Sequence, residues 1–390
     1  HHVVNFSKTR VGIGLGDGEA PQAALDVRGS LRIPTTNDGI TNGLIKINPD
    51  NLELEFCTTL HDSSQAQPAT GGTISYPSAD TTLHKFVSSG SFTVTTGPLL
   101  VEYIILAGGG SGGHNHGGGG GGGGYCRGVT KIPVGTHDII VGAGGAAGSY
   151  PSAPSNGGDS YAFGITAKGG GGGGGRGCLG GERGYSGGSG GGGAGTAVAS
   201  TSPYITTTLG GSNIIYADQW RGVRNDHSIQ GFKGGIGSSG ANTTNAGNGG
   251  GGGGAGAPGG NATGATSGAG SSGSGGSGLY DDFEIDTTSG ITGGYVNSLT
   301  GRGGGGSGGR WAEGTVGNPT LGNVSVFGGG AGGAQNNLDQ VATAGVDQKG
   351  GGGGGGSDGG GDGGDGGDGI IMIRYFRPLV QPLRNRSAGP

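Results

Sequence analysis

The residues of this sequence that could do chemistry are few, and the most suggestive group is His114-Asn115-His116. Two histidines at alternate positions of a strand face the same side, so several copies of the chain around a fibre axis could offer a ring of imidazoles to a metal ion. The alternative is a polar loop that binds no metal. We favour the loop because a monomeric glycine-rich region has no such axis, and we expect no metal and no cofactor.

Three aspartates recur at intervals of three residues, in the run Gly361-Asp362-Gly-Gly-Asp365-Gly-Gly-Asp368-Gly369. On an extended helix with three residues per turn and a rise of ~3.1 Å per residue, they would share one face at a spacing of ~9.3 Å. A calcium ion needs oxygen ligands at about 2.3–2.6 Å, so neighbouring aspartates at this spacing cannot share one ion. We expect these carboxylates to line a solvated edge.

No arrangement typical of catalysis stands out. Gly109–Gly113 matches the nucleophile motif GxSxG, but the strand–turn–helix setting and a committed acid–base pair are missing. The phosphate-binding motif GxxxxGK[ST] is absent, and GxGxxG matches carry no information in so glycine-rich a chain. Cys57, Cys126 and Cys178 are far apart and are expected to be isolated thiols. We therefore expect a protein that is not an enzyme.

Composition limits the architecture that could position these residues. Glycine accounts for 111 of the 390 residues, charged residues for 12 % and AVILMFWYC for 30 %. Glycine brings no side chain to bury, so an ordinary hydrophobic core is excluded over much of the chain. The net charge of −5 argues against nucleic-acid binding. No apolar run approaches the ~20 residues of a membrane span, so we expect no membrane insertion.

Two ordinary flanks enclose the glycine-rich region, residues 108–369. Residues 1–70 contain runs such as Leu31–Ile33 and Leu44–Asn48, which are too short for a stable isolated sheet. We expect this part to be an oligomerisation or attachment module that forms a homotrimer. The alternative is a monomer that docks onto a separate shaft. The polar residues 61–72 are predicted to be a linker.

Two strongly apolar runs border the glycine-rich region, Leu99–Ala107 before it and Ile370–Phe376 after it. Both are apolar at consecutive positions, as strands covered on two faces are. We expect them to pair and to close off the glycine-rich region like a clasp. Residues 71–107 with 370–378 would then form a small β-framework, and residues 379–390 a tail.

The glycines come in blocks that apolar segments such as Ile139–Val141 interrupt, which argues against a flexible linker. Glycine tracts can adopt the polyproline-II conformation, which has three residues per turn and no internal hydrogen bonds. Packed side by side without Cβ atoms, such helices can exchange backbone hydrogen bonds. The predicted fold is therefore mainly β, with a polyglycine II helix bundle and long loops inserted over residues 108–369. Collagen is excluded because no strict Gly-X-Y repeat occurs.

Several motifs in fixed order resemble the glycine-rich domains of viral and phage tail-fibre proteins. The opening pattern TFTV…V.VLVVGGGGGG is similar to residues 83–110, the internal pattern TVTVGAGG…GG.S.FG…A.GGGG to residues 136–169, and the closing pattern G.GIVIIRY to residues 368–375. Further upstream, residues 10–29 resemble the repeat VGIGT..P…LDV.G of tail fibres, and residues 42–56 resemble the unit G.IRYN….FE.Y.

The resemblance implies a viral tail-fibre or adhesin protein, of the phage type, that lies on the virion outside the cell and recognises a host cell-surface receptor. Its partners would be a host surface glycan or outer-surface protein and other virion tail or fibre proteins. A self-assembling structural subunit of an extracellular filament or virion coat is the alternative.

In some adhesins of this kind, loops at the tip of a polyglycine II slab bind the receptor. The resemblance therefore points to the two richest insertions here, Ser202–Gly231 and Leu279–Trp311. Exposed aromatic residues beside charged ones suit such contacts. The alternative is that the aromatic residues cap the glycine slab and supply apolar burial. The receptor-binding candidates are Tyr204, Tyr216, Trp220, Arg221, Tyr280, Asp282, Phe283, Tyr295 and Trp311.

Overall fold

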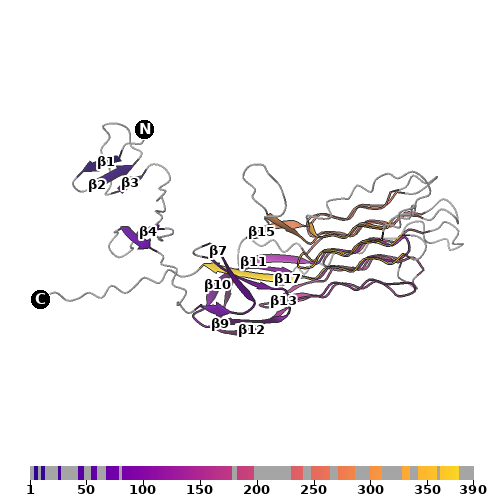
Figure 1. Cartoon of the computed structure of the whole chain (residues 1–390), viewed down its shortest axis with the longest axis horizontal. Coiled ribbons are helices and arrows are strands. Elements are labelled where there is room, and N and C mark those ends of the chain that lie inside the picture. Colours follow the sequence, from indigo (N-terminus) through magenta and orange to yellow (C-terminus); the bar gives the residue numbers. More distant parts are fainter. Residues whose placement is uncertain are drawn as a thin grey trace. The chain divides into compact units, whose positions relative to one another are not determined.

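The computed structural model divides the chain into two compact units, residues 1–65 with 378–390 and residues 66–377. It describes five short strands before residue 60 and, in the second unit, residues 67–78, 81–177, 182–196, 230–239, 247–263, 271–285, 299–309, 327–333, 341–357 and 361–376. The described part is mainly β (Figure 1). None of its helices is long and apolar enough to cross a lipid bilayer.

The first unit contains strands of three to five residues. In one sheet, β1 (Val4–Ser7) pairs antiparallel with β2 (Arg10–Ile13), and β2 pairs in parallel with β3 (Leu25–Val27). Separately, β4 (Gly43–Ile47) pairs antiparallel with β5 (Leu54–Thr58). The predicted run Leu31–Ile33 lies outside the described residues.

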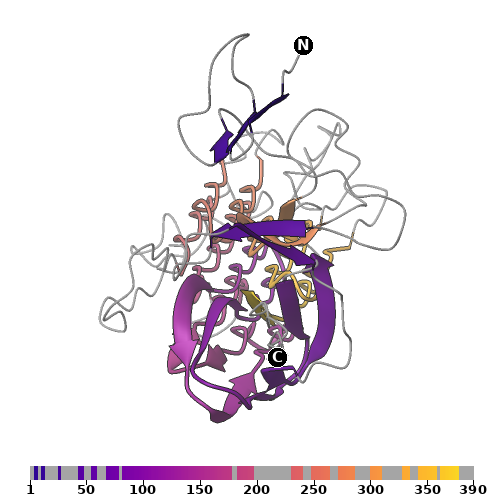
Figure 2. The ribbon, with the colours of Figure 1, turned by 90° about the vertical axis from the view of Figure 1, so that its left-hand side faces the viewer.

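The second unit contains two five-stranded sheets, visible face to face in Figure 2. The first sheet has the order β11-β10-β17-β8-β7 and the second the order β14-β13-β12-β9-β6. The strands are β6 (Ala69–Thr70), β7 (Thr73–Ser78), β8 (Thr81–Phe86), β9 (Gly90–Val94), β10 (Leu99–Leu106), β11 (Tyr125–Ile132), β12 (Gly135–Ile140), β13 (Ser160–Ala162), β14 (Ile165–Ala167) and β17 (Ile370–Phe376).

The core of this sandwich follows the alternation of strand side chains. Tyr103 and Ile105 of β10 and Ile373 of β17 point between the sheets, where they meet Phe92 and Ile139 of the second sheet. Successive residues of a strand point to opposite faces, so their neighbours belong to the other face of the first sheet. The two sheets are thus held together by one apolar layer.

The other face of the first sheet is also covered over part of its area. Ile104 and Leu106 of β10, with Met372 of β17, form a second buried cluster there. β10 and β17 pair antiparallel from Glu102–Arg374 to Leu106–Ile370. The predicted pairing of the two apolar runs is therefore confirmed. Both faces are buried at the end of the strands next to the glycine-rich region, whereas Leu100 and Phe376 at the other end are exposed.

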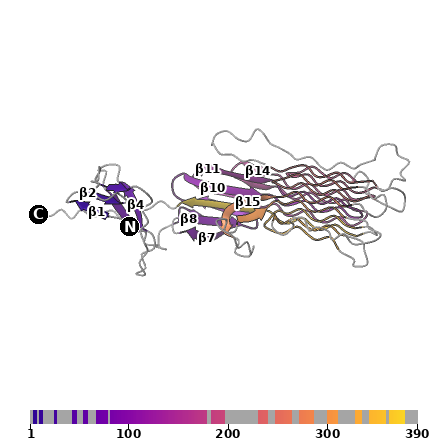
Figure 3. The same ribbon diagram turned by 90° about the horizontal axis from the view of Figure 1, so that it is seen from above.

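The glycine-rich region leaves the sandwich as extended segments that lie side by side (Figures 1 and 3), which we call the glycine rows. Each row belongs to no strand and forms backbone hydrogen bonds with its neighbours. The described rows are residues 108–113, 117–124, 142–148, 155–158, 169–175, 187–196, 231–238, 247–256, 259–263, 271–278, 303–309, 328–333, 341–346, 351–357 and 361–369.

The hydrogen bonds of the central row 117–124 repeat every three residues. The N–H groups of Gly117, Gly120 and Gly123 donate to row 351–357 and the adjoining Gly350. The N–H groups of Gly118, Gly121 and Gly124 donate to row 169–175 and the adjoining Lys168. Those of Gly119 and Gly122 donate to row 247–256. Each row of this kind thus bonds three neighbours in turn, with N···O distances of 2.8–3.0 Å in this row.

Close packing explains why these rows consist of glycine. A Cβ atom on Gly120 would overlap the carbonyl oxygen of Gly110, and one on Gly121 would overlap that of Ser189. All residues of row 117–124 are buried although they have no side chains. Burial here places backbone against backbone, so hydrogen bonds replace the missing apolar core.

Candidate functional site

A β-hairpin within the glycine-rich region carries three of the predicted receptor-binding residues, Tyr280, Asp282 and Phe283. Its strands are β15 (Leu279–Ile285) and β16 (Leu299–Arg302), which pair antiparallel with a register shift between Asp281 and Ile285. The hairpin connects glycine rows 271–278 and 303–309 at their sandwich end, and in Figure 1 β15 lies beside the first sheet.

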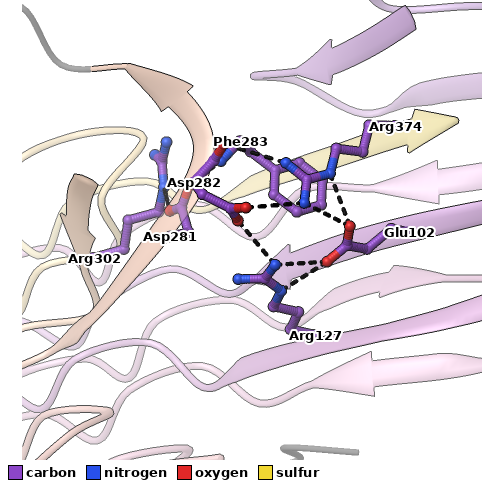
Figure 4. Close-up of polar contacts among 7 residues, drawn as sticks. All are labelled: Glu102, Arg127, Asp281, Asp282, Phe283, Arg302 and Arg374. Carbon is purple, nitrogen blue, oxygen red and sulfur yellow. Dashed lines mark hydrogen bonds and ion pairs between the residues drawn. The ribbon is translucent and has the colours of Figure 1, made fainter. Parts of the chain in front are cut away.

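Asp282 closes a ring of four alternating charges on the outer face of the first sheet (Figure 4). Arg127 of β11 contacts the Oε1 atom of Glu102 at 2.6 Å and the Oδ1 atom of Asp282 at 2.8 Å. Arg374 of β17 contacts the Oε2 atom of Glu102 at 2.6 Å and the Oδ2 atom of Asp282 at 3.1 Å. Both arginines therefore bridge a sheet carboxylate to the hairpin.

The two arginines also shift the titration of Asp282. Partial burial raises the pKa of this carboxyl group, but the hydrogen bond from Arg374 and the charges of Arg374 and Arg127 outweigh burial and leave the pKa lowered. Asp282 is thus a carboxylate at neutral pH whose two oxygens are both engaged. The arrangement anchors the hairpin to the sheet.

Phe283 lies beneath this ring and is only 2 % exposed. Its aromatic ring has the guanidinium carbon of Arg374 at 4.2 Å and that of Arg127 at 5.5 Å from its centroid, which are cation–π distances. The side chain packs into the cluster that contains Ile104 and Met372. In this structure Phe283 is therefore not available at the surface, and its position fits the alternative in which an aromatic residue supplies apolar burial.

A buried ion pair fixes the other side of the hairpin. The Nε atom of Arg302 donates to the Oδ2 atom of Asp281 at 2.6 Å, and both side chains are at most 2 % exposed. Arg302 also donates to the carbonyl oxygen of Gln348 at 2.6 Å. Removing one partner of such a buried pair typically costs about 3–5 kcal/mol, because it leaves the other charge uncompensated. Asp281 and Arg302 therefore define how β15 and β16 meet.

Of the two predicted aromatic residues that the structure describes, Tyr280 is accessible, with 48 % of its surface exposed. Its ring packs against Phe327 with centroids 4.8 Å apart and an interplanar angle of 54°. The structure thus brings Tyr280, Asp282 and Phe283 together on one short strand, with Tyr280 and Asp282 exposed and Phe283 buried. The six other receptor-binding candidates lie outside the described residues: Tyr204, Tyr216, Trp220, Arg221, Tyr295 and Trp311.

The structure places His114 and His116 in a loop, the geometry that the sequence favours over a strand. These residues form a turn between two glycine rows, with positive φ at Asn115 (48°) and His116 (58°), and not a strand with both imidazoles on one side. Both histidines are buried. Burial lowers the pKa of His114, an effect that the charge of Asp362 partly opposes. Among the described residues, no group of three His, Cys, Asp or Glu side chains could hold a metal ion.

Sequence reasoning missed Glu102, Arg127, Arg374 and Arg302, the residues that hold the hairpin. Glu102 and Arg374 are 272 residues apart in the chain and meet only because β10 and β17 pair. A usable signal was present in the two apolar runs, since each contains a single charge at a position that faces the same side once the strands are aligned.

Comparison with known proteins adds a family to this geometry. A search of curated proteins finds no match to the chain. The family model described as "Glycine-rich domain" matches residues 86–376. The match begins at the end of β8, includes the glycine rows and the hairpin, and ends with β17, so it covers about three quarters of the chain. The chain therefore belongs to the glycine-rich domain family.

Proposed function

We propose that this protein is an adhesin of a viral tail fibre, of the phage type, which binds a host-surface receptor without catalysis. The observation that carries the proposal is the threefold hydrogen-bond repeat of the glycine rows. Together the glycine rows form what we call the glycine layer. It is a rigid support that exposes side chains only at its edges, its turns and its insertions. The order of tail-fibre motifs along the sequence supports the same function.

We infer that the glycine rows are polyglycine II helices. A helix with three residues per turn directs every third N–H group to the same side. Row 108–113 has this pattern: Gly109 and Gly112 donate to row 361–369, whereas Gly110 and Gly113 donate to row 117–124. A strand would alternate between two sides, and an α-helix would bond within its own segment.

The distribution of side chains favours binding over chemistry. The central rows contain almost only glycine, whereas the aromatic candidates all lie in the insertions 202–231 and 279–311. In the hairpin, the carboxylate of Asp282 pairs with Arg127 and Arg374 and so holds β15 against the first sheet. The partner would be a host surface glycan or outer-surface protein, and residues 1–70 would attach the protein to other tail or fibre proteins on the virion.

The second candidate function is a self-assembling structural subunit of an extracellular filament or virion coat. In that case the insertions would contact neighbouring subunits. The backbone hydrogen bonds between glycine rows favour this second function, because such bonds at the edge of the glycine layer could continue from one copy of the chain to the next.

Exchanging the insertions separates the two functions. We suggest replacing residues 202–229 and, separately, residues 286–298, which leaves β15, β16 and their anchoring ring intact. An adhesin is expected to lose or change binding to host cells while light scattering shows unchanged assembly. Loss of assembly would support the structural subunit. Replacing Val87–Ser89, the exposed turn between β8 and β9, serves as the control that should change neither property.

A further inference from the structure

Row 361–369, the last glycine row, lies at the edge of the glycine layer. On one side of it is row 142–148, since Gly366 donates to the carbonyl oxygen of Gly145 at 2.8 Å. On the other side is row 341–346, whose Gly345 donates to the carbonyl oxygen of Asp365 at 2.8 Å. The inner neighbours are rows 108–113 and 351–357. Figure 2 shows the rows end-on, with the C-terminal rows in yellow on one side of the layer.

The inward and outward positions of this row differ in residue type. Gly363 and Gly366 face row 108–113, and a Cβ atom on either glycine would overlap a carbonyl oxygen of that row. Asp362 and Asp365 are exposed, and Asp368 is half-buried. The three aspartates therefore occupy the position of each triplet that points away from the layer, as the spacing of three predicted.

The neighbouring edge row has the same arrangement. Gly142, Gly145 and Gly148 are buried, whereas Ala143 and Ala146 are exposed. Side chains on the outward position exclude a further row, because rows inside this layer approach so closely that no Cβ atom fits between them. Edge rows are thus recognisable by a non-glycine residue at every third position.

The aspartates also engage backbone donors that point away from the layer. The Oδ1 atom of Asp365 accepts the N–H of Ala147 at 2.6 Å, and the Oδ1 atom of Asp368 accepts the N–H of Gly144 at 2.8 Å. In the interior of the layer, N–H groups three residues apart donate to one adjacent row. At this edge, two side-chain carboxylates take the place of that row.

We propose that Asp362, Asp365 and Asp368 close the glycine layer against lateral addition of a glycine row from a second copy of this chain. The carboxylates of Asp365 and Asp368 engage outward donors, all three side chains occupy the space of the next row, and their charges repel the same edge of another copy. Charged residues protect the edge strands of β-sheets from pairing in the same way. This inference goes beyond the proposed function and does not depend on a receptor.

The test compares the association state of variants of the full chain. The triple variant Asp362→Gly/Asp365→Gly/Asp368→Gly turns residues 361–369 into an uninterrupted glycine row. The double variant Asp362→Gly/Asp365→Gly opens the exposed part of the row and keeps the half-buried Asp368 as an acceptor. The control variant Asp138→Asn/Glu182→Gln removes acidic charges away from this edge. Light scattering over a tenfold concentration range, with circular dichroism as the check on folding, gives the readout.

The glycine variant is expected to form species at least twice the mass of the wild-type assembly, increasing with concentration, and the control variant is expected to match the wild type. If the triple glycine variant does not fold, the double glycine variant decides: larger species support the proposal, and the wild-type mass overturns it. A folded glycine variant with the wild-type mass also overturns it. Loss of host binding without a change in mass would concern only the adhesin function.

Discussion

His84 is a fully buried imidazole that fastens the start of the second unit to the sandwich. Its Nδ1 atom lies 2.7 Å from the carbonyl oxygen of Gly71 and therefore donates a hydrogen bond, and its Nε2 atom lies 3.2 Å from the hydroxyl group of Tyr375. The ring packs edge-on against Phe92 at 5.1 Å. Burial lowers the pKa of His84, and the hydrogen bond to Gly71 only partly opposes this effect.

We predict that this histidine makes the stability of the second unit depend on pH. Because the folded-state pKa of His84 is below the ordinary histidine value of 6.5, its contribution to stability is fully present above pH 6.5 and is lost as the pH falls below that value. His84→Gln should lower stability by about 1–3 kcal/mol at pH 7.5, since a buried hydrogen bond is disturbed.

The Tm difference between the wild type and His84→Gln should narrow as the pH falls from 7.5 to 5. Thermal melts followed by circular dichroism measure it, with the exposed Ser91→Ala as the control that keeps the wild-type slope. A difference that stays constant over this range would show that the protonation of His84 is not linked to folding.

At the scale of residues, the sequence shows which residue types gather in a segment, but it does not show which distant residues their side chains contact. The acidic and aromatic residues of the hairpin could be named as a group, and the aspartates at intervals of three could be placed on one edge. Whether Phe283 is exposed could not be predicted, because its burial depends on Arg127 and Arg374, which come from two strands of the first sheet. Contacts of this kind follow from strand register and not from local pattern.

The glycine row is the element that distinguishes this molecule, and its tolerance to side chains should differ sharply between positions. We predict that Gly120→Ala destabilises the protein by about 1–3 kcal/mol or more, because the new Cβ atom would overlap the main chain of Gly110, which cannot rotate away as a side chain can. The Tm is the measurement.

Gly90→Ala is the matched control. Gly90 is exposed in β9, and a Cβ atom there would have its nearest neighbour, the Cδ1 atom of Phe86, at 4.0 Å. Its Tm should remain within a degree or two of the wild type. If Gly120→Ala melts at the same temperature as Gly90→Ala, the row does not pack as closely as this structure has it.

Elements with a strong local pattern could be predicted, and elements that depend on distant partners could not. The apolar runs that became β10 and β17 were identified together with their pairing, because β-branched residues at consecutive positions indicate a strand covered on both faces. The position of the hairpin at the sandwich end of the rows was not foreseen. Its location depends on how many rows precede it, and that number cannot be counted from glycine content alone.

On the scale of the whole molecule, the division into two compact units raises the question of how the first unit is stable. Its described strands have three to five residues, and a two-stranded pair such as β4–β5 is marginally stable by itself. Small units of this kind usually need oligomerisation or another constraint. Intertwining of several copies would cover the edges of these strands and bury both of their faces.

We therefore predict that residues 1–65 make the full chain a trimer and that a protein of residues 66–377 is a monomer with an intact sandwich and glycine layer. The second unit has its own apolar core and its own hydrogen-bonded rows, so removing the first unit deprives it of neither. Light scattering on both proteins gives the masses, and thermal melts check that the shorter protein is folded. A monomeric full chain whose residues 1–65 are protected from proteolysis would contradict the trimer and favour docking of a single copy onto a separate shaft. A trimeric shorter protein would instead place the assembly contacts on the second unit.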